Sequence, residues 1–183
     1  MKKAGFACTW KIFNSKDCGV PQIRRRDYLI GCRGNVPNVP DAPMLQPPLL
    51  SEILDDDVGA ATDLPDPNTV AGRSLRSFLH QLKKKKADIK NDAWVLDIDA
   101  SPRFQTGQWE VSPTLTRSRS ARYWVTRRRR QMNTTEQFRC QGFPTEHITA
   151  LQSRRAMGNL AGNAMCVPVL THSIDALLLQ LGY

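Results

Sequence analysis

The sequence lacks any Cys-x-x-Cys pair, and its cysteines are few and scattered. An odd number of widely separated cysteines argues against a zinc knuckle and against the disulfide framework of a small secreted domain. The histidines are equally scattered, so no metal site is predicted. Reduced thiols in an intracellular protein are the simplest interpretation. The cysteines are Cys8, Cys18, Cys32, Cys140 and Cys166, and the histidines are His80, His147 and His172.

Long apolar runs are missing as well. No stretch approaches the roughly 20 consecutive apolar residues of a membrane span, and the lysines at the N-terminus are not followed by the apolar core of a signal peptide. We therefore expect no membrane partner. Aromatic residues are also few, with three tyrosines and six phenylalanines. This disfavours a generic RNA-binding protein that stacks bases on a sheet face.

Positive charge and proline are abundant. The net charge is +9, from 26 basic and 17 acidic residues, which points to a polyanionic partner such as nucleic acid. Charge alone leaves open the alternative that these are solvated surface residues. The 183 residues can bury one ordinary core, and 12 prolines with 11 glycines indicate long connections.

The first part of the chain has the pattern of a β-hairpin. Phe6–Phe13 alternates apolar and polar residues, residues 14–19 have turn chemistry, and Asp27–Arg33 is a second strand pattern. We expect the two strands to pair antiparallel at the edge of a sheet. Arg24 and Arg26 lie two residues apart, so in an extended segment their guanidinium groups face the same side.

A region of different composition follows. Residues 34–69 are rich in proline, which excludes a buried strand or a long helix but allows one short turn at Ser51–Leu54. We interpret this region as a linker into an inserted domain. Within the insert, Arg73–Lys86 has the spacing of an amphipathic helix, Trp94–Ala100 alternates as a strand, and Pro113–Thr116 begins a short extended piece.

A short capped helix is predicted near residue 133. Asn133 is a favourable N-cap, and Glu136 three residues later completes a capping box. Gly142 is expected in the left-handed conformation that ends such a helix. Arg130 and Arg139 then lie at the two ends of a short rigid rod, which places two guanidinium groups.

The last predicted element is a helix with an apolar face. Such a face needs a partner surface, because exposed leucines promote aggregation. Its residues are Leu170, Ile174, Leu177, Leu178 and Leu181.

The capped helix and its surroundings resemble the ninth shared motif of DNA (cytosine-5) methyltransferases, Arg-x-Leu-Ser/Thr-x-x-Glu-x-x-Arg-x-Gln-Gly-Phe-Pro. Met132 replaces the leucine and Asn133 replaces the Ser/Thr cap. Two further motifs of the family stand in the family's order. Residues 19–26 resemble Gly-Val-Pro-Gln-x-Arg-x-Arg, and residues 162–169 resemble Gly-Asn-Ala-Val/Met-x-x-Pro-Val. The ninth motif is matched at Arg130, Glu136, Arg139, Gln141, Gly142, Phe143 and Pro144.

The resemblance implies an α/β fold that forms the C-terminal part of an S-adenosylmethionine-dependent, Rossmann-like methyltransferase. Residues 1–34 would form an edge β-hairpin of the catalytic domain. Residues 35–112 would form a linker and an irregular, mixed target-recognition insert. Residues 113–183 would contain the helix that supports recognition and the C-terminal helices that return to the catalytic domain.

The resemblance also implies roles for single residues. Arg26 would donate to the ring carbonyl oxygen of an extruded cytosine, with Arg24 steadying the site or a phosphate. Gln22 would order the loop, and Asn163 and Met165 would line the pocket for the cofactor S-adenosyl-L-methionine. Two structural alternatives stay open: residues 22–26 as a basic strand edge, and residues 162–165 as a glycine turn before a helix.

Double-stranded DNA is the partner that the family implies. Basic residues bracket Tyr123 and Trp124, and phosphate contact is the natural use of such a segment, although a solvated charge run is an alternative. The predicted phosphate contacts are Arg117, Arg119, Arg130 and Arg139, and the residues predicted to hold the motifs in shape are Gln22, Glu136, Gln141 and Gly142.

Three features of the family are absent from this sequence. No cysteine follows a proline, no glutamate precedes an asparagine, and there is no Phe-x-Gly-x-Gly loop. We therefore expect the C-terminal half of the enzyme, inactive without a complementary N-terminal half that carries the nucleophile. The alternative is a non-catalytic DNA-binding remnant. Either would be intracellular: nuclear in a eukaryote, and in the cytoplasm or nucleoid of a bacterium.

Overall fold

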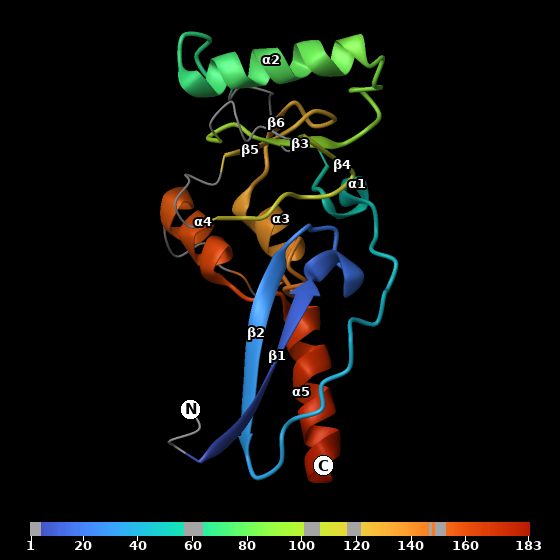
Figure 1. The fold of residues 1–183 in the computed structure, drawn as a ribbon. Coiled ribbons are helices and arrows are strands. Elements are labelled where there is room, and N and C mark those ends of the chain that lie inside the picture. The colour runs from blue at the N-terminus through green and yellow to red at the C-terminus, as the bar shows by residue number, and fades with distance from the viewer. Residues whose placement is uncertain (1–4, 57–63, 101–106, 117–121, 147, 149–152) are drawn as a thin grey trace.

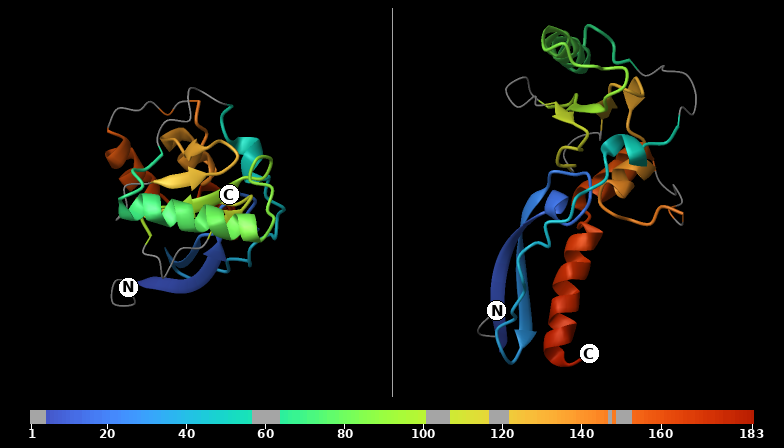
Figure 2. Two further views of the ribbon diagram at one scale, coloured as in Figure 1. Left: turned by 90° about the horizontal axis from the view of Figure 1, so that it is seen from above. Right: turned by 90° about the vertical axis from the view of Figure 1, so that its right-hand side faces the viewer.

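The computed structural model describes residues 5–56, 64–100, 107–116, 122–146, 148 and 153–183. A long β-hairpin and the C-terminal helix lie side by side at one end of the molecule. A small sheet covered by a helix forms the other end, and three short helices lie between them (Figures 1 and 2). Within the proline-rich region at residues 34–69, the described residues outside α1 (Leu50–Ile53) are irregular, as the sequence predicted.

The hairpin consists of β1 (Phe6–Asn14) and β2 (Arg25–Arg33). The strands pair antiparallel over their whole length, from Phe6 opposite Arg33 to Asn14 opposite Arg25, which confirms the predicted hairpin. The burial pattern is less expected. Trp10 and its cross-strand partner Leu29 are 64% and 60% exposed, so the apolar phase of β1 faces outward while Phe13 enters the core.

Beside the hairpin lies α5 (Val167–Leu181), which confirms the predicted C-terminal helix. Phe13 makes an edge-to-face contact with His172 of α5. A small core joins the two elements, and it contains Phe13, Cys18, Val20, Val39, Cys166 and Val169.

The insert contains a four-stranded antiparallel sheet of order β4-β3-β5-β6. Its strands are β3 (Trp94–Asp97), β4 (Gln108–Trp109), β5 (Tyr123–Val125) and β6 (Arg130–Gln131). Because β5 pairs with β3, and β6 pairs with β5, this sheet extends beyond residue 112, where the sequence suggested the insert to end. Pro113–Thr116, between β4 and β5, forms no strand.

The helix α2 (Val70–Lys84) covers one face of this sheet (Figure 2). It begins after Thr69, whose hydroxyl accepts a hydrogen bond from the amide of Gly72, slightly before the start that the apolar spacing predicted. Its apolar face packs against the strands, which confirms the predicted amphipathic helix. The buried residues of this layer are Ala71, Leu75, Phe78, Leu82, Leu96, Ile98 and Trp124.

Tyr123 and Trp124 lie in the middle of the sheet, and they are only 1% and 3% exposed. The Tyr123 hydroxyl accepts a hydrogen bond from the amide of Thr116. The two aromatic rings therefore pack in the core. The interpretation of this segment as basic groups interleaved with aromatics on a nucleic-acid surface is wrong for the aromatics.

The opposite face of the sheet packs on short helices. These are α1 (Leu50–Ile53), α3 (Thr134–Arg139) and α4 (Arg154–Asn163). The single turn α1 and the capped helix α3 were both predicted, whereas α4 was not. The core between these elements includes Leu50, Val95, Tyr123, Met132, Phe138, Met157 and Ala161.

The stretch Arg154–Leu181 is apolar and long enough to cross a membrane by length and composition alone. It consists of α4 and α5, and the extended backbone of Ala164 and Cys166 separates them. The separate helices have 10 and 15 residues, each shorter than the roughly 20 that a span needs. A search for continuous apolar runs misses this stretch because polar residues such as Asp175 interrupt it.

Candidate functional site

A hollow of about 530 Å³ lies between β2, the α4–α5 connection and α5. Arg26 lines it from the strand, and Asn163 and Met165 line it from the connection. All three side chains are exposed. The structure thus brings together one predicted base contact and both predicted cofactor contacts. In the sequence the base contact is far from the two cofactor contacts: the neighbouring residues Arg24 and Gly162 are 138 positions apart. The apolar wall of the hollow includes Leu170, Ile174 and Leu177.

Arg24 also lines the hollow, but its side chain is only 6% exposed. Its guanidinium donates to three backbone carbonyls: Nη1 to Leu115 at 3.1 Å, and Nη2 to Gly162 at 3.1 Å and to Ala164 at 2.8 Å. The last two carbonyls flank Asn163. Burial, followed by the nearby charge of Arg26, lowers the pKa of Arg24. The side chain is thus directed at backbone carbonyls of the protein, and its role in steadying the site or a phosphate stays a prediction.

The backbone of Arg24 is fixed as well. Its amide donates to the side chain of Asn14 at 3.1 Å, and its carbonyl accepts hydrogen bonds from Ser15. The entry into β2 is therefore held on both sides of the Arg24 side chain. Arg26, two residues later, projects from the strand as an exposed side chain.

Gln22 is fully buried beside this entry. Its backbone lies in a bridge with Ser112, and the amide of Ile23 donates to the Ser112 carbonyl at 2.9 Å. The side-chain amide of Gln22 has no hydrogen-bond partner among the residues that the structure describes. The segment is thus ordered through its backbone, and the predicted role of the Gln22 side chain stays a prediction.

The three recognised motifs meet at Gly142. This residue has φ +77, the left-handed conformation that was predicted. A Cβ atom there would lie 2.6 Å from Cδ of Pro168 and 3.3 Å from a methyl group of Val20. Gln141 adds two further links, because its side chain donates to the carbonyl of Ala161 and its own carbonyl accepts from the amide of Val167. The end of α3 therefore fixes the start of α5.

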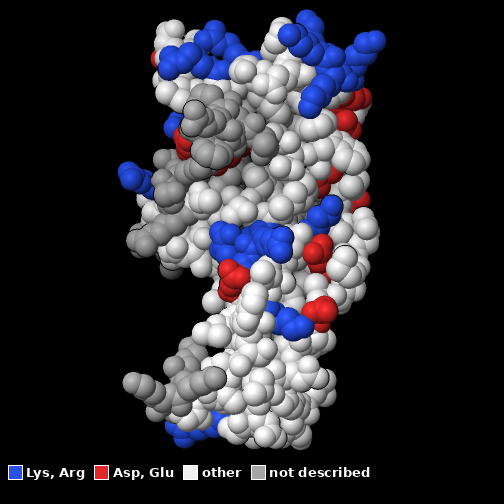
Figure 3. Space-filling view, in the orientation of Figure 1, with Lys and Arg blue, Asp and Glu red and all other residues white. Residues whose placement is uncertain are grey.

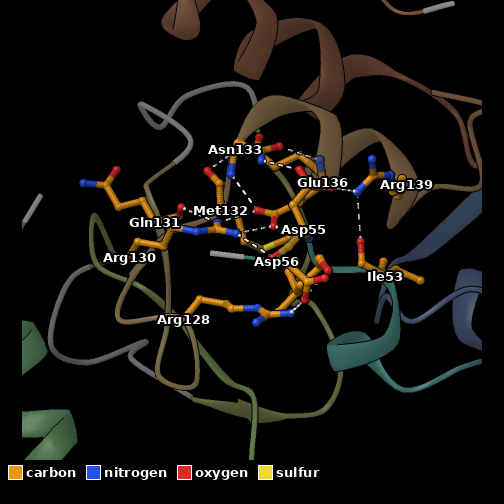
Figure 4. Close-up of polar contacts among 12 residues, drawn as sticks. Ile53, Asp55, Asp56, Arg128, Arg130, Gln131, Met132, Asn133, Glu136 and Arg139 are labelled. Atoms are coloured by element: carbon orange, nitrogen blue, oxygen red, sulfur yellow. Dashed lines mark hydrogen bonds and ion pairs between the residues drawn. The ribbon is translucent and has the colours of Figure 1, made fainter. Parts of the chain in front are cut away.

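The N-terminus of α3 is held by the predicted capping box. The side chain of Asn133 accepts from the amide of Glu136, and the carboxylate of Glu136 accepts from the amide of Asn133, both at 2.8 Å. Glu136 is fully buried. Arg130 forms a two-point ion pair with it, at 2.7 and 2.9 Å (Figure 4). Most of the polar capacity of Arg130 is thus used inside the protein.

Arg139, at the other end of α3, is directed at the end of the linker. Its guanidinium pairs with Asp55 and donates to the carbonyl of Ile53 at 3.1 Å (Figure 4). Burial opposes the charge of Asp55, but hydrogen bonds from Arg139 and Asn133 outweigh it and lower the pKa of Asp55. The contacts among Ile53, Asp55, Asn133 and Arg139 tie the linker to α3. DNA contact by Arg130 and Arg139 stays a prediction, and Arg117 and Arg119 lie outside the described residues.

The three buried cysteines are not activated nucleophiles. Burial raises the pKa of Cys18 to about 11 and that of Cys140 to about 12, and it also raises the pKa of Cys166. Only the thiolate attacks carbon, so thiols with raised pKa values are inert near neutral pH. This agrees with the absence of a Pro-Cys pair from the sequence.

The motifs, their order in the chain and their convergence on one hollow match a single group of proteins. A family model described as C-5 cytosine-specific DNA methylase matches residues 1–178. The chain belongs to this family. A curated relative is the type II methyltransferase M.NgoBI of Neisseria gonorrhoeae, which is 28% identical over 97% of this chain.

Solved structures of methyltransferases share the fold. The Entamoeba histolytica methyltransferase EhMeth has a TM-score of 0.61 at 14% identity, and it aligns with 98% of this chain. The S. pombe Dnmt2 methyltransferase has a TM-score of 0.61 at 16% identity, and it aligns with the whole chain. This methylase-family chain spans 53% of M.NgoBI, 56% of EhMeth and 59% of Dnmt2, so it corresponds to about half the length of these relatives.

A methyl donor is implied by the family, and the hollow fits one. Its volume lies within the 300–1,000 Å³ that small-molecule sites occupy, at roughly the middle of that range. Its wall combines apolar residues of α5 with the amide of Asn163 and the thioether of Met165. Asn163 can both donate and accept hydrogen bonds. These residues would hold part of S-adenosylmethionine.

Two functional contacts of this methylase chain were not predicted from its sequence. Asp55 was read as part of a linker, and the carbonyl of Leu115 carries no sequence signal at all. For Asp55 the sequence did contain a signal, because a run of three aspartates is unusual in a basic chain. The arginines predicted at the two ends of α3 had no assigned carboxylate partners, so these aspartates were candidates for that role. Pairing the two would have indicated the network of Figure 4.

Proposed function

We propose that this chain supplies the cytosine-holding and cofactor-holding residues for methylation of carbon 5 of cytosine in DNA. The observation that supports this best is the shared hollow of Arg26, Asn163 and Met165. A base can reach such a site only when it leaves the helical stack. The family membership of residues 1–178 supports the reaction class.

Arg26 and Arg24 have different roles in this proposal. The exposed guanidinium of Arg26 donates to the ring carbonyl oxygen of the extruded cytosine, where it anchors the base and stabilises the negative charge that develops during reaction. Arg24 holds the connection that carries Asn163 at a fixed distance from β2. S-adenosylmethionine, when bound, supplies the methyl group.

The nucleophile comes from a complementary N-terminal half. Thiolate attack on carbon 6 is needed before methyl transfer, and the buried thiols of Cys18, Cys140 and Cys166 do not provide it. Among the described residues, β2 pairs only with β1, so its other edge is free for a further strand. Apolar side chains of the hairpin and of α5 are exposed and would be covered by that half: Trp10, Leu29, Ile174, Leu178 and Leu181.

The test is complementation. The chain is mixed with an N-terminal half that carries Pro-Cys, and transfer of labelled methyl groups to duplex DNA is measured. Arg26→Ala should lower the rate about 10²–10³-fold, the usual effect of removing a donor from a developing oxyanion. Arg25→Ala is the matched control, because its side chain is exposed on the same strand but does not line the hollow. Equal rates for Arg26→Ala and the unchanged chain would refute the assigned role.

A second candidate function is a DNA-binding remnant without catalysis. The inert, buried thiols are as compatible with it as with a split enzyme, because neither function takes its nucleophile from these cysteines. It predicts duplex binding but no methyl transfer with any N-terminal half, even when the two halves form a complex. The neighbouring reading frame separates the two functions at once, because only a split enzyme needs Pro-Cys and Glu-Asn-Val segments encoded beside it.

A further inference from the structure

The outer face of α2 carries a row of basic side chains. The first four are spaced by three, four and three residues, which places them along one side of the helix, the fifth follows directly after the fourth, and all are exposed. The opposite face is buried on the sheet, and α2 contains no acidic residue. Figure 3 shows lysine and arginine side chains gathered over this end of the molecule. We call these residues the α2 row: Arg73, Arg76, His80, Lys83 and Lys84.

The α2 row is not neutralised by the described residues. Arg73 donates to the carbonyl of Asn68 and Arg76 to the carbonyl of Pro67, each at 2.5 Å. These bonds involve neutral acceptors at the start of the helix. The ion pairs among the described residues involve other basic groups, namely Lys11, Arg122, Arg128, Arg130 and Arg139. The positive charge of the α2 row therefore faces solvent.

A hollow of about 530 Å³ lies at the C-terminal end of this row. Its lining combines apolar and basic side chains, so a phosphate group could contact two ammonium groups while the adjoining sugar packs on carbon. The hollow is lined by Leu79, His80, Lys83, Lys86, Ala87 and Ile89.

Lys86 occupies a position where glycine is the usual residue. It follows the end of α2 with φ +54, and the amides of Lys86 and Ala87 close the helix on the carbonyls of Lys83 and Leu82. A lysine in this left-handed conformation is strained. Strained residues cluster at ligand-binding sites, and Lys86 lines the hollow.

We propose that the α2 row, together with Lys86, binds the phosphodiester backbone of double-stranded DNA. The choice of DNA rests on the proposed function. From Arg73 to Lys83 the row extends about 15 Å along the helix, and duplex DNA presents about nine phosphate charges over that length. In Figure 1, α2 forms one end of the molecule, while β2 and α5, which line the hollow that holds Arg26, lie below the insert. It contributes affinity without reading sequence.

The experiment measures binding of the full chain to a short DNA duplex by fluorescence anisotropy at several salt concentrations. Two lysines are removed in Lys83→Gln/Lys86→Gly, and the dependence of log affinity on log salt should become shallower by about two, one for each lost phosphate contact. The control Lys16→Gln/Arg155→Gln removes the same charge from exposed positions outside the row and should keep the original slope.

The single variant Lys86→Gly separates binding from folding. Glycine relieves the left-handed strain, so the melting temperature should rise while DNA affinity falls. A role limited to helix capping predicts the rise without the fall.

Two results would overturn the proposal: an equal loss of slope in the control pair, which would reduce the effect to net charge, or tighter binding of double-stranded RNA than of DNA. If the two lysines change the salt slope as expected but the complementation test shows no methyl transfer, the result would count against the proposed function alone.

Discussion

Nη2 of Arg24 lies 2.8 Å from the carbonyl oxygen of Ala164, 140 residues further along the chain. The same nitrogen reaches the carbonyl of Gly162, and Nη1 reaches that of Leu115. One buried side chain thus ties together the entry of β2, the segment between β4 and β5, and the connection that carries Asn163. The position of Asn163 relative to Arg26 depends on Arg24 more than on any contact between those two residues.

Arg24→Gln should therefore loosen the connection between α4 and α5. Hydrogen bonds to charged groups contribute about 1.5–3 kcal/mol each when their partners are left unsatisfied, and Gln is too short to reach all three carbonyls. We expect faster amide exchange at residues 162–166 and a lower urea midpoint. Arg25→Gln removes the same charge from an exposed neighbour and should change neither measurement. Unchanged exchange in Arg24→Gln would show that packing alone holds the connection.

Gly142→Ala should lower the free energy of unfolding by more than the cost of holding an alanine in the left-handed conformation. That strain costs about 1–2 kcal/mol, and the added Cβ would also press on Pro168 at the start of α5. Gly34→Ala is the control, because Gly34 has φ +99 but open space around its Cβ position. Urea unfolding of both variants isolates the contact with Pro168. Equal losses of stability would mean that α5 shifts freely to make room.

Glu136→Gln tests the buried ion pair with Arg130. The amide preserves the shape and part of the capping box, but it leaves the guanidinium of Arg130 without its counter-charge. Breaking one side of a buried pair costs about 3–5 kcal/mol, so the free energy of unfolding should fall by roughly 3 kcal/mol. Glu146→Gln, at an exposed position, should cost almost nothing. A neutral result for Glu136→Gln would assign the stability of α3 to packing instead.

Asp55 should make stability depend on pH in the acid range. Its pKa is lowered in the folded protein, so the folded state binds fewer protons than the unfolded state between that value and about 3.9. The contribution of Asp55 is therefore fully present above about pH 4 and is lost as pH falls through its folded pKa. At pH 6 we expect Asp55→Asn to have a lower urea midpoint than the unchanged chain. As the pH is lowered from 6, the midpoint of Asp55→Asn should fall less steeply than that of the unchanged chain. Parallel curves would contradict the ion pair with Arg139.

The elements that the sequence predicted well are those with a local cause. Period-two alternation specifies the hairpin, the i, i+3, i+4 spacing specifies α2, and Asn133 with Glu136 specifies the start of α3. Gly142 likewise has the left-handed conformation that its place after α3 required. In each case a few neighbouring residues determine the backbone, so no knowledge of distant contacts is needed.

The features that were missed depend on distant partners. Arg130 and Arg139 look like exposed cations in the sequence because their carboxylates, Glu136 and Asp55, become partners only after the linker folds onto α3. Trp124 has basic neighbours in sequence but β3 and β6 as neighbours in space. The outward orientation of Trp10 has the same origin, since only the side of the hairpin that meets α5 belongs to the core of this chain.

The pairing of the hairpin with α5 also sets an order of assembly during synthesis. The hairpin leaves the ribosome before α5, and residues that complete its core and accept hydrogen bonds of Arg24 follow about 140 positions later. At translation speeds of about 5–20 residues per second, this is a delay of roughly 7–28 s. During that interval the sheet and helix of the insert can form from contacts closer in sequence, while the hairpin stays exposed to chaperones.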